Sequence, residues 1–168
     1  MVTAYDAPTA RIANQAGADI ILVGDSVASI VLGYEDTLAV TVDDMLHHTA
    51  AVTRVRPHAL VVGDLPWLSY HISVEETVRN AGRFLREAHA GAVKLEGGRK
   101  RLPMIRALLD AEIPVMGHLG LTPQSIHTMG GYQVQGKRIE AARELLEDAR
   151  ALANEGIFAL VLEGIPDV

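Results

Sequence analysis

The nine residues Ala90–Gly98, "AGAVKLEGG", combine a short apolar run with two charged residues, Lys94 and Glu96. Successive side chains of a strand point to opposite faces, so Lys94 and Glu96 share one face while Val93 and Leu95 share the other. A short apolar run of this kind is typical of a parallel sheet that is buried on both faces. We therefore expect Val93 and Leu95 to contact helices, and the two charges to lie at the rim where the strand ends.

The same pattern, an apolar run followed by an amphipathic segment, recurs along the whole chain. The expected strands are Val2–Tyr5, Ile20–Val23, Ala59–Gly63, Ala92–Leu95, Ile113–Gly117 and Phe158–Leu162. The expected helices are Pro8–Gly17, Val42–Val55, Val74–Ala88, Leu102–Asp110 and Ile139–Asn154. This alternation predicts a parallel sheet with helices packed outside it, either a doubly wound open sheet or a (β/α)8 barrel. No G-x-G-x-x-G follows the first strand, which argues against a dinucleotide-binding fold.

Composition excludes several classes of function. The chain has 168 residues, of which 49% are hydrophobic and 21% charged, and its net charge is -6. Its basic residues are scattered, so we expect neither nucleic acid nor a membrane surface as partner. It has no cysteine, which excludes disulfides, thiolate metal sites and cysteine nucleophiles. No apolar run approaches the roughly 20 residues that span a bilayer and no signal peptide is seen, so we expect a cytoplasmic protein.

Polar side chains stand at the carboxyl ends of five consecutive expected strands. They are Asp25 and Ser26, Asp64, Lys94 and Glu96, His118, and Glu163. Any one of them alone could be a loop residue facing water, but repetition at equivalent points favours a site. Carboxylates that converge must protonate, take up water or hold a cation. All-oxygen ligands favour Mg²⁺ first and Mn²⁺ second, and zinc less, because only one histidine lies at this rim.

Six motifs occur in order over essentially the whole chain. They are "TAYDAPTARIANQAGADIILVGDS", "DLPWLSY", "NAGRFLREAHAGAVKLEGG", "VMGHLGLTPQS", "GGYQVQGK" and "LVLEGIP". Together they resemble the ketopantoate hydroxymethyltransferase family. The resemblance implies a (β/α)8 TIM barrel of the phosphoenolpyruvate/pyruvate superfamily and a large homo-oligomer, such as a decamer. It also implies transfer of a hydroxymethyl group from 5,10-methylenetetrahydrofolate to the α-keto acid 3-methyl-2-oxobutanoate, giving 2-dehydropantoate for pantothenate synthesis.

The resemblance also implies roles for the residues of the rim. Asp25, Asp64 and Glu96 are the expected ligands of Mg²⁺. The residues expected to contact the keto acid are Asp25, Ser26, Asp64 and Lys94. Glu163 is the expected proton acceptor, and His118 is expected close to the reacting centre.

The number of expected strands is six, whereas the barrel of the family has eight. We therefore expect residues 1–168 to form a single domain that is a partial barrel, without the family's amino-terminal helix and its last two βα units. Such a sheet would expose an unpaired parallel edge.

Three alternatives remain open. One is another Mg²⁺-dependent α-keto acid lyase of the same superfamily. A second is a Schiff base formed by Lys94, because buried lysines can attack ketones. The third is an inactive barrel fragment with a structural role.

Overall fold

The structure, a computed structural model, describes residues 1–167 and contains six strands and a series of helices. The strands are β1 (Val2–Thr3), β2 (Ile20–Val23), β3 (Leu60–Asp64), β4 (Ala92–Glu96), β5 (Val115–Gly120) and β6 (Ala159–Glu163). The longer helices are α1 (Ala7–Gln15), α3 (Val42–Thr53), α4 (Val74–Arg86), α5 (Leu102–Asp110) and α7 (Ile139–Glu155). The short ones are α2 (Val27–Ile30), α6 (Ile126–Met129) and the 3-10 helices η1 (Arg99–Arg101) and η2 (Pro123–Ser125).

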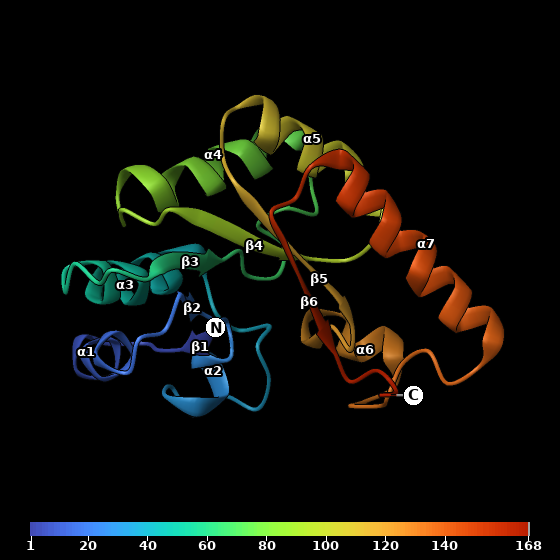
Figure 1. Cartoon of the computed structure of the whole chain (residues 1–168), viewed down its shortest axis with the longest axis horizontal. Coiled ribbons are helices and arrows are strands. Elements are labelled where there is room, and N and C mark those ends of the chain that lie inside the picture. Colours follow the sequence, from blue (N-terminus) through green and yellow to red (C-terminus); the bar gives the residue numbers. More distant parts are fainter. Residues whose placement is uncertain (168) are drawn as a thin grey trace.

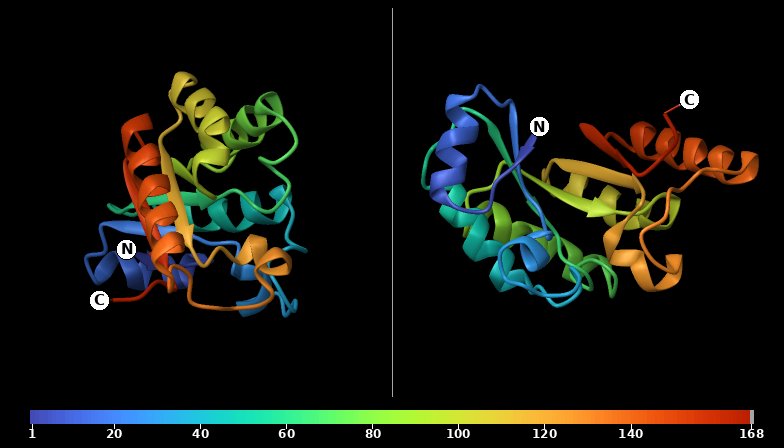
Figure 2. Two further views of the ribbon diagram at one scale, coloured as in Figure 1. Left: turned by 90° about the vertical axis from the view of Figure 1, so that its right-hand side faces the viewer. Right: turned by 90° about the horizontal axis from the view of Figure 1, so that it is seen from below.

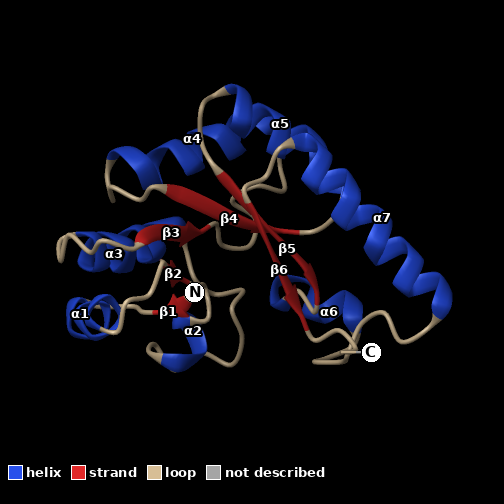
Figure 3. Ribbon diagram, in the orientation of Figure 1, coloured by secondary structure: helices blue, strands red, loops and turns tan. Residues whose placement is uncertain are grey.

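All six strands are parallel and pair in chain order, β1 to β6. Helices α1, α3, α4, α5 and α7 form an arc outside this sheet (Figure 1), and Figure 2 gives two further views of the arrangement. Figure 3 separates the inner layer of strands from the outer layer of helices by colour. Consecutive pairing with helices on one side is the pattern of a (β/α) barrel, here a half-barrel whose edge strands are β1 and β6. The open doubly wound alternative is wrong, since its strand order reverses at a switch point.

The two faces of the sheet bury different side chains. Val93 and Leu95 are fully buried in the large cluster between sheet and helices, which also contains Phe84 of α4. Ala92, on the other face of β4, belongs to a small inner cluster, together with Met116 of β5. Burying a Val, Leu or Phe side chain stabilises the fold by roughly 1.5–3 kcal/mol each. The prediction that Val93 and Leu95 face the helices is confirmed, and Lys94 and Glu96 therefore face the inside of the half-barrel.

Several strands run one to three residues further than predicted, and this places charged residues within the sheet. The expected ends were Gly63, Leu95, Gly117 and Leu162, whereas the strands end at Asp64, Glu96, Gly120 and Glu163. The reason is backbone pairing, which apolar patterning does not report: Asp64 pairs with Lys94, Glu96 with His118, and Gly120 with Glu163.

Local signals start the longer helices close to where they were expected. Thr41 caps α3 with a reciprocal capping box to Asp44, and the Ser73 side chain accepts a hydrogen bond from the Glu76 backbone in α4. Helix α7 ends at Gly156, which adopts the left-handed conformation (φ 106°) that suits glycine. The single-turn helices α2 and α6 were not predicted, since four residues carry no periodic signal. Of the helices in residues 1–167, none combines the length and the apolarity that crossing a bilayer demands.

Candidate active site

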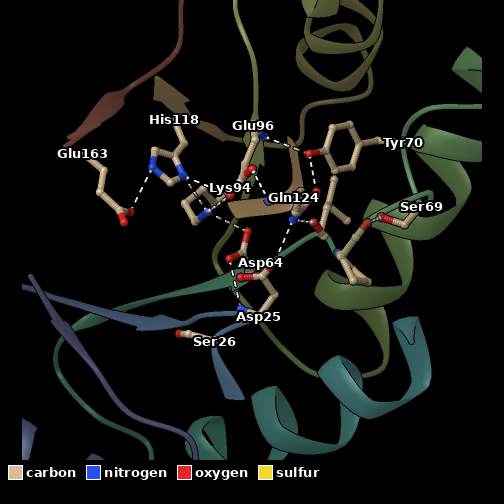
Figure 4. Close-up of polar contacts among 12 residues, drawn as sticks. Asp25, Ser26, Asp64, Ser69, Tyr70, Lys94, Glu96, His118, Gln124 and Glu163 are labelled. Atoms are coloured by element: carbon tan, nitrogen blue, oxygen red, sulfur yellow. Dashed lines mark hydrogen bonds and ion pairs between the residues drawn. The ribbon is translucent and has the colours of Figure 1, made fainter. Parts of the chain in front are cut away.

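The structure brings the residues expected at the rim together at the carboxyl ends of the strands (Figure 4). Asp25 and Ser26 lie in the turn after β2, Asp64 ends β3, Lys94 and Glu96 lie on β4, His118 lies on β5, and Glu163 ends β6. Parallel strands present their carboxyl ends at one edge, which is where barrel enzymes carry their sites. Lys94 and Glu96 are each only 3% exposed, so they lie deeper than a solvated rim would place them.

Lys94 is the positive centre of this cluster. Its Nζ lies 2.9 Å from Asp64 Oδ1 and 3.9 Å from Glu96 Oε1, and it is 3.3 Å from His118 Nδ1. Burial opposes the charge on Lys94, but the carboxylates of Asp64, Glu96 and Asp25 outweigh it and hold the lysine pKa above its usual range. Lys94 is therefore an ammonium ion at neutral pH.

Asp64 is the carboxyl group that burial affects most. Complete burial raises the pKa of Asp64 to about 7, against the pull of Lys94, and the nearby carboxylates of Asp25 and Glu96 add to the rise. Burial also raises the pKa of Asp25. The cluster thus carries less negative charge at neutral pH than its three acids formally supply.

This environment makes the stability of the metal-free protein depend on pH. The folded state holds the Asp64 proton more tightly (pKa about 7) than the unfolded state does (about 4), so Asp64 contributes stability that is complete below pH 4 and lost as the pH rises through 7. With divalent ions chelated, we expect this group to lower the free energy of unfolding by on the order of 2 kcal/mol between pH 5 and pH 8.

Urea denaturation of the protein and of Asp64→Asn at several pH values measures this contribution. Asn cannot titrate, so the free energy of unfolding of Asp64→Asn should fall less steeply as the pH rises. The fall that remains comes from Asp25 and His118, whose pKa values are also raised. Asp19→Asn, at an exposed position, is the matched control and should keep the native slope. Equal slopes for the native protein and Asp64→Asn would refute this account of Asp64.

His118 links the buried cluster to Glu163. Its Nδ1 lies 3.2 Å from Glu96 Oε1 and its Nε2 lies 3.2 Å from Glu163 Oε2. Burial disfavours the imidazolium, but Glu163 and Glu96 together outweigh burial and raise the pKa of His118. The contact with His118 in turn lowers the pKa of Glu163, which is about half exposed. Glu163 is therefore an ionised carboxylate that is open to a ligand, as a general base must be.

Gly120 sets the position of Glu163. Gly120 has φ 90°, and a Cβ atom built there would overlap the Glu163 carbonyl oxygen. The neighbouring Leu121 N–H donates to that same oxygen at 2.7 Å. Only glycine allows β5 and β6 to approach this closely at the rim.

We expect Gly120→Ala to displace Glu163 and to strain the left-handed backbone. The cost is about 1–3 kcal/mol of unfolding free energy, together with a fall in kcat that exceeds any change in KM. Thermal unfolding and steady-state kinetics measure the two effects, and Gly33→Ala, also at positive φ but with open space around it, is the control for backbone strain alone. If the two variants lose the same activity, Gly120 does not position Glu163.

Ser26 has a partner that sequence reasoning missed. Its Oγ lies 2.8 Å from the hydroxyl of Tyr5, a residue between β1 and α1. The Tyr5 carbonyl oxygen is itself 2.8 Å from Nδ1 of His48. Ser26 is thus oriented from the segment that follows β1. The signal was Tyr5 in the first of the motifs quoted above, 21 residues before Ser26.

Gln124 and Tyr70 are two further buried residues of the cluster that the expected site did not include. Gln124 lies in η2 and donates a hydrogen bond from Nε2 to Asp25 Oδ2 at 2.9 Å. The Tyr70 hydroxyl donates to Gln124 Oε1 at 2.5 Å. Both stand inside motifs quoted above, but their residue types carry no charge pattern that would single them out.

The carboxylates provide oxygen ligands but do not form a ready-made metal cage. Asp64 Oδ1 and Glu96 Oε1 are buried and accept no hydrogen bond from the described residues, although Lys94 and His118 lie near them as ionic partners. Within residues 1–167, no three His, Asp or Glu side chains are spaced to hold a metal ion as they stand. Carboxylate oxygens are the ligands that a hard divalent cation prefers, so the chemistry of Asp25, Asp64 and Glu96 fits one. Their assignment as metal ligands stays a prediction.

Two segments that follow strands, one after β2 and one after β5, meet in a hollow. The loop after β2 contributes Glu35 and Asp36, while the segment after β5 contributes His127, Gly130 and Tyr132. The hollow has a volume of about 490 Å³. Part of the second segment is helical, as α6.

Comparison with known proteins identifies relatives over the whole chain. The family described as ketopantoate hydroxymethyltransferase matches residues 1–168. The 3-methyl-2-oxobutanoate hydroxymethyltransferase of Syntrophomonas wolfei is 59% identical over 166 residues, which cover 99% of this chain and 60% of the relative. The enzyme of the same name from Geobacter sulfurreducens is 58% identical, covering 99% of this chain and 62% of the relative. The chain thus spans about three fifths of the length of these relatives.

Solved structures share the fold at low sequence identity. A putative phosphonomutase from Burkholderia cenocepacia superposes with a TM-score of 0.77 at 18% identity, covering 99% of this chain and 69% of that one. A phosphonopyruvate hydrolase solved with oxalate and Mg²⁺ gives 0.73 at 14% identity, covering 97% and 57%. A 2,3-dimethylmalate lyase of the PEP mutase/isocitrate lyase superfamily gives 0.70 at 21% identity, covering 98% and 57%. These likenesses confirm the expected barrel fold.

Proposed function

Because this chain belongs to the ketopantoate hydroxymethyltransferase family, we propose that its protein transfers a hydroxymethyl group from 5,10-methylenetetrahydrofolate to 3-methyl-2-oxobutanoate, giving 2-dehydropantoate. The observation that carries the proposal is the convergence of the residues implied by the family on one rim, although they come from five different strands. Such convergence supports an intact site rather than a barrel fragment with a purely structural role.

A divalent cation, Mg²⁺ or in its place Mn²⁺, would be held by Asp25, Asp64 and Glu96. When bound, it would supply Lewis-acid chemistry that makes the C3–H of the α-keto acid more acidic. The positive charge would also lower the pKa of Asp64, which burial otherwise holds at about 7.

The keto acid would be bound by Ser26 and Lys94 beside the acids. The Ser26 hydroxyl, oriented by Tyr5, can donate a hydrogen bond to an oxygen of the substrate. The Lys94 ammonium offsets the negative charge of the substrate carboxylate and of the enolate that forms on proton removal. Since Lys94 is held in place by Asp64 at 2.9 Å, little reorganisation is needed as that charge develops.

Glu163 would remove the C3 proton of the keto acid. Its carboxylate is ionised, about half exposed, and oriented by His118 Nε2 at 3.2 Å. The C3–H electron pair then forms the enolate, whose C3 attacks the methylene carbon of the folate. A new C–C bond forms, both bonds between the methylene carbon and the folate nitrogens break, and water supplies the hydroxyl group of the product. The remaining proton of water and the proton removed from C3 go to the two folate nitrogens.

The Schiff-base alternative finds less support in this geometry. A lysine attacks a ketone only as the free amine, whereas the carboxylates around Lys94 raise its pKa above the usual range. Borohydride in the presence of the keto acid should therefore leave Lys94 unmodified. Covalent labelling of Lys94 with activity that resists chelation would favour the Schiff base.

The assay that tests the proposed function supplies the protein with both substrates, with and without Mg²⁺. We expect formation of 2-dehydropantoate that EDTA abolishes and Mg²⁺ restores. Cleavage of a 2,3-dimethylmalate-like substrate without any hydroxymethyl transfer would instead favour a lyase of the superfamily, the fold of which this chain shares. We further propose that the protein is a homo-oligomer, which sedimentation analysis of the purified protein tests. We also propose that it is cytoplasmic.

A further inference from the structure

Gln124 connects the ends of four strands through its own hydrogen bonds. Its side-chain Nε2 donates to Asp25 Oδ2 at 2.9 Å, after β2, and to the Leu65 carbonyl oxygen at 3.0 Å, after β3. Its backbone N–H donates to Glu96 Oε2 at 3.1 Å, at the end of β4. Gln124 itself follows β5 and is only 5% exposed. Figure 4 shows it between the two acids.

The direction of the Gln124 amide is determined by its partners. The Leu65 carbonyl can only accept, so it must face the NH₂ group. On the other side, the Tyr70 hydroxyl oxygen accepts from the Glu96 backbone N–H at 3.1 Å, and its hydrogen is directed to Gln124 Oε1. A reversed amide would place its oxygen against two acceptors and its NH₂ against a hydroxyl that needs an acceptor. The NH₂ group is therefore directed at Asp25.

The result is that one oxygen of each of two acids is held by the same residue. Asp25 Oδ2 and Glu96 Oε2 both accept from Gln124, whereas Glu96 Oε1 accepts no hydrogen bond from the described residues. The two donors, the backbone N–H and the side-chain NH₂ of Gln124, are uncharged. They therefore hold the carboxylates of Asp25 and Glu96 near each other without cancelling the negative charge that a cation needs. Residues that donate hydrogen bonds to metal ligands, without contacting the metal themselves, orient the ligands and strengthen metal binding.

We propose that Gln124 is a positioning residue that orients Asp25 and Glu96 toward a bound divalent cation, and that Tyr70 acts on the cation site by setting the direction of the Gln124 amide. The inference rests on the proposed function, because that function supplies the cation. It predicts that both residues affect cation affinity without contacting the cation.

The test is Mn²⁺ binding by the purified protein, measured by electron paramagnetic resonance in the absence of substrate. Gln124→Met keeps the side-chain length but removes the amide, and it should weaken Mn²⁺ binding about 10- to 100-fold. Tyr70→Phe removes only the hydroxyl and should weaken binding by roughly threefold or more, but less than Gln124→Met does. In the double variant, affinity should equal that of Gln124→Met alone, since Tyr70 acts through the amide.

Thermal unfolding separates positioning from a merely structural role. Tyr70→Phe also leaves the Glu96 N–H without its partner, so its effect on the melting temperature should persist in the Gln124→Met background while its effect on affinity vanishes. Tyr34→Phe and Gln133→Met, at exposed positions, are matched controls and should bind Mn²⁺ as the native protein does.

Native Mn²⁺ affinity in Gln124→Met, with only a lower melting temperature, would overturn the proposal, and additive affinity losses would overturn the role of Tyr70. If Gln124→Met does not fold, Tyr70→Phe decides: a threefold loss supports the proposal and native affinity overturns it. Absence of Mn²⁺ binding by the native protein would overturn both this proposal and the proposed metal. Tight Mn²⁺ binding that depends on Gln124, without hydroxymethyl transfer, would support positioning and contradict only the proposed function.

Discussion

Replacing Glu163 with glutamine should lower kcat by about 10²–10⁴-fold, with KM for the keto acid changed much less. The amide keeps the size and the position of the side chain but cannot accept a proton from C3. The structure supports a base at this position because contact with His118 lowers the pKa of Glu163 and keeps it ionised, while about half of the side chain stays accessible.

The measurement is steady-state kinetics with both substrates at saturating Mg²⁺. Glu140→Gln, at an exposed position in the first turn of α7, is the matched control and should retain native kcat. A Glu163→Gln variant with kcat within a factor of about three of native would assign the proton transfer to another group. It would also be the result expected of a purely structural role for the chain.

Replacing Lys94 with methionine should have the second large effect, on both stability and turnover. Methionine matches the length of the lysine stem but leaves the buried carboxylates of Asp64, Glu96 and Asp25 without their cation. Removing one partner of a buried ionic cluster costs about 3–5 kcal/mol of unfolding free energy. We expect that cost at pH 8 without divalent ions, and a smaller one at pH 5, where a carboxyl with a pKa of about 7 can protonate instead.

Urea denaturation at both pH values and kinetics at saturating Mg²⁺ measure these effects. Added Mg²⁺ should restore part of the stability, because a bound cation balances the same carboxylates, while kcat/KM for the keto acid stays at least about 10²-fold below native. Lys137→Met, at an exposed position, is the control. Native stability at pH 8 in Lys94→Met would show that the cluster does not depend on this charge.

Much of the fold could be predicted from the sequence, because parallel strands buried on both faces carry a strong apolar signal. The faces of Val93 and Leu95 followed from alternation alone and are confirmed. The strand ends did not follow: Glu96 and Glu163 belong to the sheet because they pair with His118 and Gly120. Pairing between residues 22 to 43 apart in the chain is a property of the tertiary structure.

The charged residues of the site could be predicted from the sequence, whereas its neutral polar residues could not. Several acids at equivalent strand ends predict a cluster of like charges, and such a cluster indicates a cation site. Gln124 and Tyr70 carry no such signal. Each is an ordinary polar residue until the fold places Gln124 between Asp25 and Glu96 and Tyr70 beside Gln124. Their importance comes from hydrogen-bond direction, which only the assembled rim defines.

The most direct test of the central claim is exchange of the C3 hydrogen of 3-methyl-2-oxobutanoate in D₂O, followed by proton NMR with protein and Mg²⁺ but without folate. Because Glu163 is proposed to remove this proton before any carbon is transferred, the C3–H signal should decay at a rate that depends on protein and Mg²⁺. Decay should fall to the solution background in Glu163→Gln. A C3–H signal that persists with the native protein, or that decays equally with Glu163→Gln, would contradict the account.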